Sequence, residues 1–328
     1  MKEKNMTENK TMRVLFMGTP ELARETLAAV YAKEGVTVVG VVTRADKLSG
    51  RGMKLVFSPV KEFALEHDIP VYQPKTLRDG AFQAVLDELR PEMIIVAAYG
   101  NILPHYVIEY PKYGCINAHG SLLPKYRGAA PIQRAIIDGE RVTGITAMYM
   151  DDGLDTGDMI LKLECPIGDE DDFESVHDRL AALAGEAMCK VIDMTWDGCV
   201  PREKQDDALS TYAAKIGKED EIIDFSRSPK TVVDLVRGLS PDPFAVTKTP
   251  DGKLLKITKA VVADGECDAP YGTVVALKAK GDGAIDVSCG GGIIRILGVV
   301  PEGKKKMPAS AFVNGRKIAV GDVLAYTE

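Results

Sequence analysis

Two short polar clusters carry side chains that could catalyse acyl transfer. Asn117 and His119 lie two residues apart in GCINAHGSLLPKYRGAAPIQ (114–133), where a strand should end. The period of two along a strand points both side chains to the same face. The second cluster, MDDGLDTGDMI (150–160), places Asp155 among glycine turns. An amide, an imidazole and a carboxylate can together bind a developing oxyanion, move a proton and orient the group that moves it.

Each of these residues also has a structural explanation. A single histidine is most often structural, and Asn or Asp beside glycine is typical of turns. His67, His105 and His177 lie in helical or loop contexts without polar company and are interpreted as structural. From spacing alone, the catalytic grouping is therefore a hypothesis.

The elements expected to position these side chains are alternating strands and helices. Strand-like runs occur at 13–18, 36–43, 93–99, 115–120 and 143–150, and helical patterns near 20–35, 58–67, 79–89 and 172–194. This alternation predicts an α/β fold with a doubly wound, mainly parallel sheet. In such sheets the carboxyl ends of the strands open into the ligand crevice, where the polar clusters would lie.

The pattern changes after about residue 206. A helical stretch at 231–239 is followed by short β-rich pieces separated by glycine and aspartate, at 253–263, 272–279, 284–289 and 292–300. These features predict a second, smaller β-barrel domain, OB-like in type. The polar segment REKQDDALS (202–210) is interpreted as a linker. We therefore expect domains at 1–206 and 207–328.

Charge and composition limit the classes of function. The net charge of −7 gives no support to a nucleic-acid partner, but it is uneven. Residues 1–207 hold 24 basic and 33 acidic residues, and residues 208–328 hold 17 and 15. The N-terminus lacks an apolar signal run, and the six cysteines form no CxxC. We expect a cytoplasmic protein with reduced thiols, no membrane partner and no metal.

Common cofactor and nucleophile motifs are absent from the sequence. MGTPEL (17–22) lacks the second and third glycines of GxGxxG, and Arg44 follows the second strand where an acid is needed. A nicotinamide cofactor is therefore not expected. No GxxxxGK[ST] and no GxSxG occur, which argues against nucleotide hydrolysis and against a nucleophilic Ser121.

The two polar clusters resemble the signature of the folate-dependent formyltransferase family. NAHGSLLPKYRGAAP followed by MDDGLDTGDMI carries the resemblance, and RVLFMGTPELA resembles the family's first strand and turn. The resemblance implies that Asn117, His119 and Asp155 are catalytic and that 10-formyltetrahydrofolate is the co-substrate. It also implies a set of carrier-binding residues in two segments: Ile102, Leu103, Ser121, Leu122, Leu123 and Pro124.

The second half resembles the members of this family that formylate methionyl-tRNA. TYAAKIGKEDEIIDF (211–225), PDP (241–243) and PEGKKKM (301–307) carry this likeness. Phe225 stands where these members usually have tryptophan, so an aromatic residue is kept. The likeness implies formyl transfer to the amino group of initiator methionyl-tRNA, for translation initiation. We expect the chain to act as a monomer.

Basic residues in two places are expected to contact the tRNA. The loop TRADKLSGRGMKLVFSPVK (43–61) is basic with a single acid, Asp46, and tRNA-modifying relatives carry a basic insertion there. Lysine and arginine contacts to phosphate would give salt-dependent affinity. A solvated surface run explains the same loop without a partner. The candidates are Arg44, Lys47, Arg51, Lys54, Lys304, Lys305 and Lys306.

Two alternative functions stay open at this point. The first is a related formyltransferase or hydrolase that acts on a sugar amine, glycinamide ribonucleotide or water. The glycinamide enzyme is about one domain long and would leave residues 208–328 unexplained. The second is a non-catalytic tRNA- or folate-binding protein, against which the presence of all three catalytic residue types argues.

Overall fold

The computed structural model describes residues 11–49, 54–278, 283–315 and 317–325. The chain divides into two compact units. The first consists of the chain up to Ala129, Thr143–Cys165 and His177–Ala213; the second consists of Ala130–Val142, Pro166–Val176 and the chain from Ala214 on. The expected boundary at 206/207 lies close to the last division point. The two inserted segments of the second unit have no counterpart in the expected domains.

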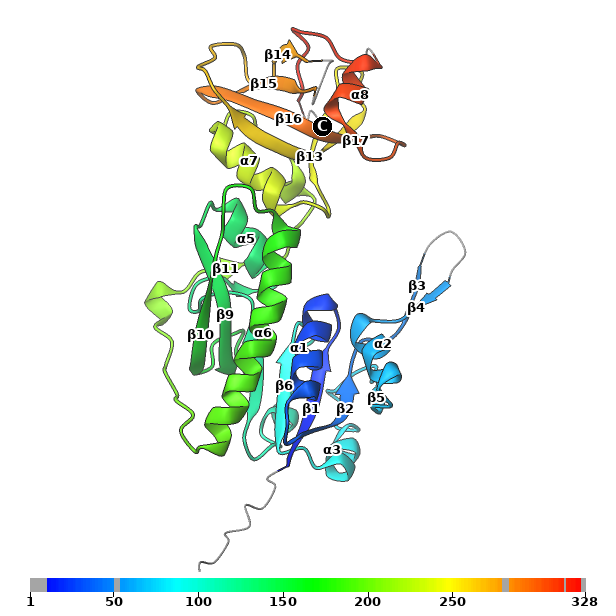
Figure 1. The fold of residues 1–328 in the computed structure, drawn as a ribbon, viewed down its shortest axis with the longest axis vertical. Helices are drawn as coiled ribbons and strands as arrows, with labels where there is room; N and C mark the ends of the chain where they lie inside the picture. Colours follow the sequence, from blue (N-terminus) through cyan, green and yellow to red (C-terminus); the bar gives the residue numbers. More distant parts are fainter. Residues whose placement is uncertain (1–10, 50–53, 279–282, 316, 326–328) are drawn as a thin grey trace, which may run out of the picture. The chain divides into compact units, whose positions relative to one another are not determined.

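The first unit is built on a seven-stranded sheet in the order β10-β9-β7-β6-β1-β2-β5 (Figure 1). The four pairings among β7, β6, β1, β2 and β5 are all parallel, so the predicted mainly parallel sheet is confirmed. Continuous β-branched and apolar runs form these strands because both faces of the sheet are covered. Their bounds are β1 (Met12–Gly18), β2 (Val36–Val42), β5 (Val71–Tyr72), β6 (Met93–Ala97), β7 (Cys115–His119), β9 (Val142–Tyr149) and β10 (Met159–Pro166).

The strand expected at 143–150 differs from the parallel series in its direction. It is β9, and it runs antiparallel to β7. The helix between these strands, α5 (Pro131–Ile137), belongs to the second unit. A parallel pair requires a crossover that returns over the same sheet, and α5 does not provide one.

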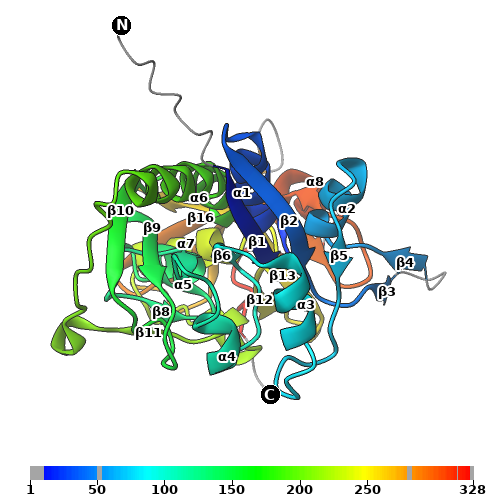
Figure 2. The ribbon, with the colours of Figure 1, turned by 90° about the horizontal axis from the view of Figure 1, so that it is seen from below.

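Helices cover both faces of this sheet (Figure 2). α1 (Glu21–Ala32) and α6 (Phe173–Trp196) lie on one face, where a side chain on Gly185 would come within 2.6 Å of Ala29. α3 (Gln83–Leu89) and α4 (His105–Ile108) lie on the other face. There they pack with alternate residues of the central strands, Leu15, Met17, Ile94, Val96 and Cys115.

Shorter elements complete the first unit. α2 (Pro59–Glu66) begins after Ser58, whose hydroxyl caps the helix by accepting from the Lys61 amide. Proline at the first helical position has the backbone angle that a helix start needs. β3 (Lys47–Ser49) pairs antiparallel with β4 (Lys54–Val56), and β8 (Arg127–Gly128) pairs parallel with β11 (Tyr212–Ala213). The short helix η1 (Asp207–Leu209) precedes β11.

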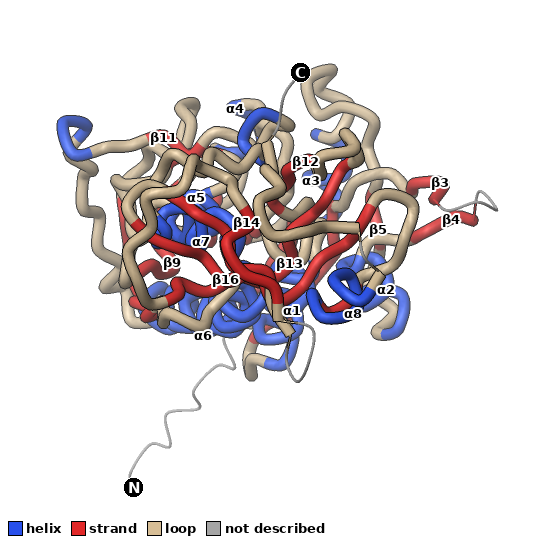
Figure 3. Tube along the Cα trace, turned by 90° about the horizontal axis from the view of Figure 1, so that it is seen from above, coloured by secondary structure: helices blue, strands red, loops and turns tan. Residues whose placement is uncertain are grey.

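The second unit contains an antiparallel sheet with strand order β12-β13-β16-β15-β14, and β17 pairs with β16 (Figure 3). The predicted second domain built on short β-strands is confirmed, and its sheet is antiparallel. α7 (Pro229–Gly238) packs against β13 and α5. The remaining bounds are β12 (Ala245–Lys248), β13 (Leu254–Ala263), β14 (Val274–Leu277), β15 (Ile285–Cys289), β16 (Gly292–Pro301), β17 (Met307–Pro308), α8 (Ala309–Asn314) and η2 (Glu219–Glu221).

No helix within the described ranges is both long enough and apolar enough to span a bilayer.

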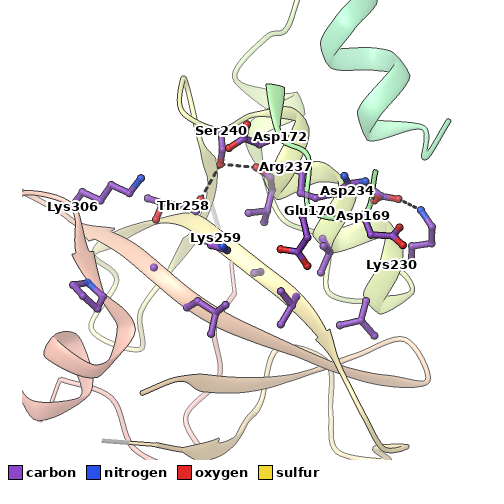
Figure 4. A pocket seen from close by; sticks show the side chains of 18 of the residues that line it. Asp169, Glu170, Asp172, Lys230, Asp234, Arg237, Ser240, Thr258, Lys259 and Lys306 are labelled. Carbon is purple, nitrogen blue, oxygen red and sulfur yellow. Dashed lines mark hydrogen bonds and ion pairs between the residues drawn. The ribbon is translucent and has the colours of Figure 1, made fainter. Parts of the chain in front are cut away.

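A buried ion pair within α7 positions Arg237, which hydrogen-bonds the inserted segment 166–176 of the second unit. The Arg237 guanidinium donates to Asp234 Oδ1 at 2.6 Å and to the carbonyls of Gly168 and Asp171 at 2.8 and 2.6 Å. The side chains of Arg237 and Asp234 are only 10% and 6% exposed. Lys230 contacts the other carboxylate oxygen of Asp234, and Figure 4 shows these three residues together.

We expect Arg237→Met to lower the free energy of unfolding by about 3 kcal/mol, because it leaves a buried carboxylate short of a partner and two carbonyls without donors. Urea denaturation followed by circular dichroism measures this change. Arg227→Met is the control, since Arg227 is 70% exposed and its ion pair with Asp224 should contribute less than about 1 kcal/mol. Equal effects of both substitutions would contradict the prediction.

Candidate active site

Asn117 and His119 end β7 on the face that carries the core residue Cys115. Because the strand has a period of two, buried Cys115 and the polar residues Asn117 and His119 lie on the same face. Asn117 is half-buried, and His119 is only 5% exposed. In the neighbouring strands, Asn117 is in register with Val96 of β6, and His119 with Thr146 of β9.

The His119 imidazole lies between two hydrogen-bond acceptors. Its Nε2 is 2.9 Å from the carbonyl oxygen of Tyr126, and its Nδ1 is 3.6 Å from Asp155 Oδ1. A carbonyl and a carboxylate can only accept, so each ring nitrogen of His119 faces an acceptor. The predicted histidine and aspartate are thus brought together, although one ends a strand and the other lies in a turn 36 positions later.

Asp155 is held from the opposite side by the loop that follows β7. Its Oδ2 accepts from the Gly128 amide at 2.9 Å, and its side chain is 15% exposed. Gly128 has φ +117, and a Cβ there would meet the ring of Tyr212 at 2.7 Å and the carbonyl of Ala213 at 2.8 Å. Only glycine can therefore bring its amide to the carboxylate in this position.

The predicted carrier-binding segment 121–124 is ordered by internal hydrogen bonds. The fully buried Ser121 hydroxyl donates to the carbonyl of Lys125 at 2.7 Å. Thr146 donates to the Ser121 carbonyl at 2.7 Å and accepts from the Leu123 amide at 3.1 Å. Leu123 is 1% exposed, whereas Leu122 and Pro124 are partly exposed. The Ser121 hydroxyl therefore stabilises the loop through its bond to Lys125, and its burial argues against a role as a nucleophile.

The second predicted carrier-binding segment follows β6. Leu103 is 3% exposed and belongs to the core, whereas Ile102 is 71% exposed. Arg44 donates from Nη2 to the carbonyl of Gly100 at 2.6 Å. Burial raises the pKa of the neighbouring Tyr99, so its phenol remains protonated. In this loop, Leu103 is therefore buried in the core, whereas the apolar side chain of Ile102 is exposed to solvent.

The basic residues expected to contact tRNA fall in different surroundings. The Arg44 guanidinium donates to the carbonyl of Gly100 in the first unit, and Lys47 is exposed. Arg51 lies outside the described residues, as does the side chain of Lys54. The acid of this loop, Asp46, is paired with Lys61 at 2.6 Å; hydrogen bonds from Lys61 and then Gln73 lower the pKa of Asp46.

Lys304, Lys305 and Lys306 form an exposed turn between β16 and β17. In the part of the chain that the structure describes, no ion pair is formed by these three lysines. Lys306 also lines a cavity of about 860 Å³ that lies wholly within the second unit (Figure 4). Several charged residues of this cavity pair with one another, and none of the predicted catalytic residues lines it.

Two residues that sequence reasoning did not identify, Gln205 and Arg127, connect the turn that carries Asp155 to the loop that follows β7. Gln205 donates from Nε2 to the carbonyls of Asp155 and Gly157 at 2.8 and 2.9 Å. Its Oε1 accepts from Nε and Nη2 of Arg127 at 3.0 and 2.8 Å. Gln205 lies in the polar segment interpreted as a linker, and nothing in that segment's composition signals such contacts.

Within the described ranges, no group of three or more His, Cys, Asp or Glu side chains is arranged to hold a metal ion. The site offers an amide, an imidazole and a carboxylate, and the last two are held by neighbouring groups: His119 by the Tyr126 carbonyl and Asp155, and Asp155 by the Gly128 amide. Such a set can stabilise an oxyanion and transfer protons.

Comparison with known proteins identifies the relatives of this chain. The family model described as "Formyl transferase" matches residues 12–192, and the model described as "Formyl transferase, C-terminal domain" matches residues 215–317. The N-formyltransferase from Helicobacter canadensis, solved with folinic acid and dTDP-3-aminofucose, superimposes with a TM-score of 0.63 at 19% identity, over 87% of this chain and 99% of that one. HypX from Aquifex aeolicus, solved with tetrahydrofolic acid, gives a TM-score of 0.62 at 19% identity, over 97% of this chain and 51% of that one. At these identities the likeness concerns the fold.

Sequence relatives are much more similar. The methionyl-tRNA formyltransferase of Caldanaerobacter subterraneus is 47% identical over 95% of this chain and 100% of its own length. That of Geobacter metallireducens is 46% identical over 94% of this chain and 97% of its own length. Family models that together span most of the sequence, and relatives this similar over their whole length, lead to one conclusion: the chain belongs to the formyl transferase family.

Proposed function

We propose that the chain transfers the formyl group of 10-formyltetrahydrofolate to the amino group of methionine on initiator methionyl-tRNA. The observation that carries this proposal is the convergence of His119 and Asp155 beside Asn117 at the end of β7. The choice of methionyl-tRNA as the acceptor is supported by relatives of 42–47% identity that bear the name methionyl-tRNA formyltransferase.

The reaction forms one C–N bond and breaks another. The methionine amine attacks the formyl carbon, whose oxygen becomes an oxyanion in the tetrahedral intermediate. Collapse of the intermediate breaks the bond to folate N10, which takes a proton as the former amine loses one. We assign the Asn117 amide to the oxyanion, and His119 to proton transfer and charge stabilisation. Asp155 favours the charged imidazolium through its contact with Nδ1.

The two substrates are assigned to different parts of the chain. The residues expected to contact the carrier, Ile102 and Leu103 after β6 and Ser121 to Pro124 after β7, bind the folate. The exposed Ile102 offers an apolar surface for its ring system. The first unit thus carries the chemistry. The loop 43–61 and the turn with Lys304, Lys305 and Lys306 bind phosphates of the tRNA through their positively charged side chains. The enzyme acts as a cytoplasmic monomer.

The acceptor is tested by offering purified protein 10-formyltetrahydrofolate with four acceptors: initiator methionyl-tRNA, an amino sugar nucleotide, glycinamide ribonucleotide, and water alone. We expect formyl transfer to methionyl-tRNA, measured as formylmethionine released from the tRNA. Transfer to another amine, or release of formate without an amine, would assign the chain to a different branch. Absence of any turnover would favour a binding protein.

We expect His119→Ala and Asn117→Ala each to reduce kcat at least about 100-fold, because each removes a group that acts on the developing charge. Steady-state rates at saturating folate and tRNA measure this effect. His177→Ala is the matched control, since His177 lies on α6 and has no assigned role. Near-normal turnover in a catalytic variant would remove that residue from the mechanism.

For the basic loop, we expect Lys47→Glu combined with Arg51→Glu to raise KM for methionyl-tRNA about tenfold and to weaken its salt dependence. KM for folate should stay unchanged. Arg44→Gln should also raise KM for folate, because Arg44 holds the carbonyl of Gly100 in the folate-binding segment.

The matched control for the loop is Lys75→Glu with Arg78→Glu, which makes the same change of charge at exposed positions outside it. An unchanged KM for tRNA in the loop variant would show that the loop does not bind this substrate.

A further inference from the structure

The segment after α6 crosses both catalytic loops of the first unit. We call residues 203–213 the strap. At its start, Glu203 exchanges two main-chain hydrogen bonds with Met159, at 2.8 and 2.9 Å. Towards its end, the carbonyls of Thr211 and Ala213 accept from the amides of Arg127 and Ala129, both at 2.9 Å. The strap is therefore bonded at one end beside the Asp155 turn and at the other to the loop after β7.

Gln205 is the least exposed residue in the first part of the strap, residues 203–209. Every residue of 201–209 is described, and within this range all side chains except that of Gln205 belong to exposed residues. Its Nε2 donates to the carbonyls of Asp155 and Gly157, and its Oε1 accepts twice from Arg127. One amide group thus connects the turn that carries the catalytic carboxylate to the loop that carries the acceptor of His119.

The Asp155 turn needs such support from outside. Asp155 has φ +54, in the left-handed region that residues other than glycine seldom adopt. A residue in this conformation persists when surrounding contacts determine it. Gln205 bonds the carbonyl of this residue, while the Gly128 amide bonds its carboxylate. Without the first contact, the turn is free to relax and to move the carboxylate away from the imidazole.

Arg127 transmits the constraint between the loops. It precedes Gly128, and its guanidinium also donates to Asp207 Oδ1 of the strap at 2.7 Å. Gln205 has both an amide donor and its oxygen engaged, so it has no polar group left for a substrate. Its effect on chemistry must therefore be indirect.

We propose that Gln205 is a positioning residue for formyl transfer: it fixes the Asp155 turn and thereby keeps the carboxylate at the imidazole of His119. This inference rests on the proposed function, since it requires that Asp155 acts on His119 during the reaction.

Two variants separate the hydrogen bonds from the shape of the side chain. Gln205→Leu removes all four bonds, and Gln205→Glu keeps the size and can still accept from Arg127 but cannot donate to two carbonyls. We expect both to lower kcat about 10- to 100-fold, the usual effect of removing a group that orients a functional side chain. KM for methionyl-tRNA and for 10-formyltetrahydrofolate should change little. Lys204→Gln, at the adjacent exposed position, is the control and should keep the normal rate.

The decisive measurement is a double-mutant cycle with Asp155→Asn. If Gln205 acts through Asp155, then Gln205→Leu should cause no further loss of kcat once Asp155 is replaced. A residue that only stabilised the fold would lower both activities by the same factor. Thermal unfolding of each variant is measured in parallel, and Gln205→Glu provides the cycle should the leucine variant not fold.

Normal kcat in both Gln205 variants, or multiplicative losses in the cycle, would overturn this inference while the unmodified chain still formylates methionyl-tRNA. Absence of that transfer in the unmodified chain would instead overturn the proposed function, and the inference with it. Loss of kcat that disappears in the Asp155→Asn background is the expected result.

Discussion

The contact between the His119 imidazole and the Asp155 carboxylate places strict demands on the first unit. One partner ends a strand, and the other lies in the turn after β9, the neighbouring strand. The pairing of β7 with β9 brings the two segments together, but it does not fix the carboxylate. Asp155 is mostly buried, where an ion pair is stronger than in water but an unpaired carboxylate is also costlier. The amide of Gly128 and the imidazole of His119 are the two partners of this carboxylate.

The loops around this contact contain an unusual concentration of left-handed backbone. Tyr126 and Asp155 have φ of +60 and +54, and Gly128 has +117. Tyr126 supplies the carbonyl that faces His119, and Gly128 supplies the amide that faces Asp155. A left-handed conformation points the main-chain amide and carbonyl groups in directions that differ from those in helices and strands. Here these conformations let backbone atoms, rather than further side chains, hold His119 and Asp155.

The sequence predicted those parts of the fold that depend on local pattern. Continuous apolar runs such as 36–43 and 93–99 identify strands covered on both faces, and the polar residues after 115 identify the end of a strand. The direction of β9 was not predictable, because a buried apolar run does not indicate whether the strand pairs parallel or antiparallel with its neighbour. Gln205 was missed for a similar reason: a polar run with glutamine and aspartates is typical of a linker, and its partners lie about 50 and 80 positions away.

The division of the chain into units limits how it can be taken apart. α5 buries Ile132 and Ile136, and it packs against α7, which follows almost one hundred residues later. A polypeptide that stops after Ala213 would retain α5 but lack its cover, and so would expose an apolar helix face prone to aggregation. Recombination between relatives at that position meets the same difficulty, because a helix from one parent must fit a surface from another. Because two segments of the second unit lie before Ala213 in the chain, no single cut separates one unit from the other.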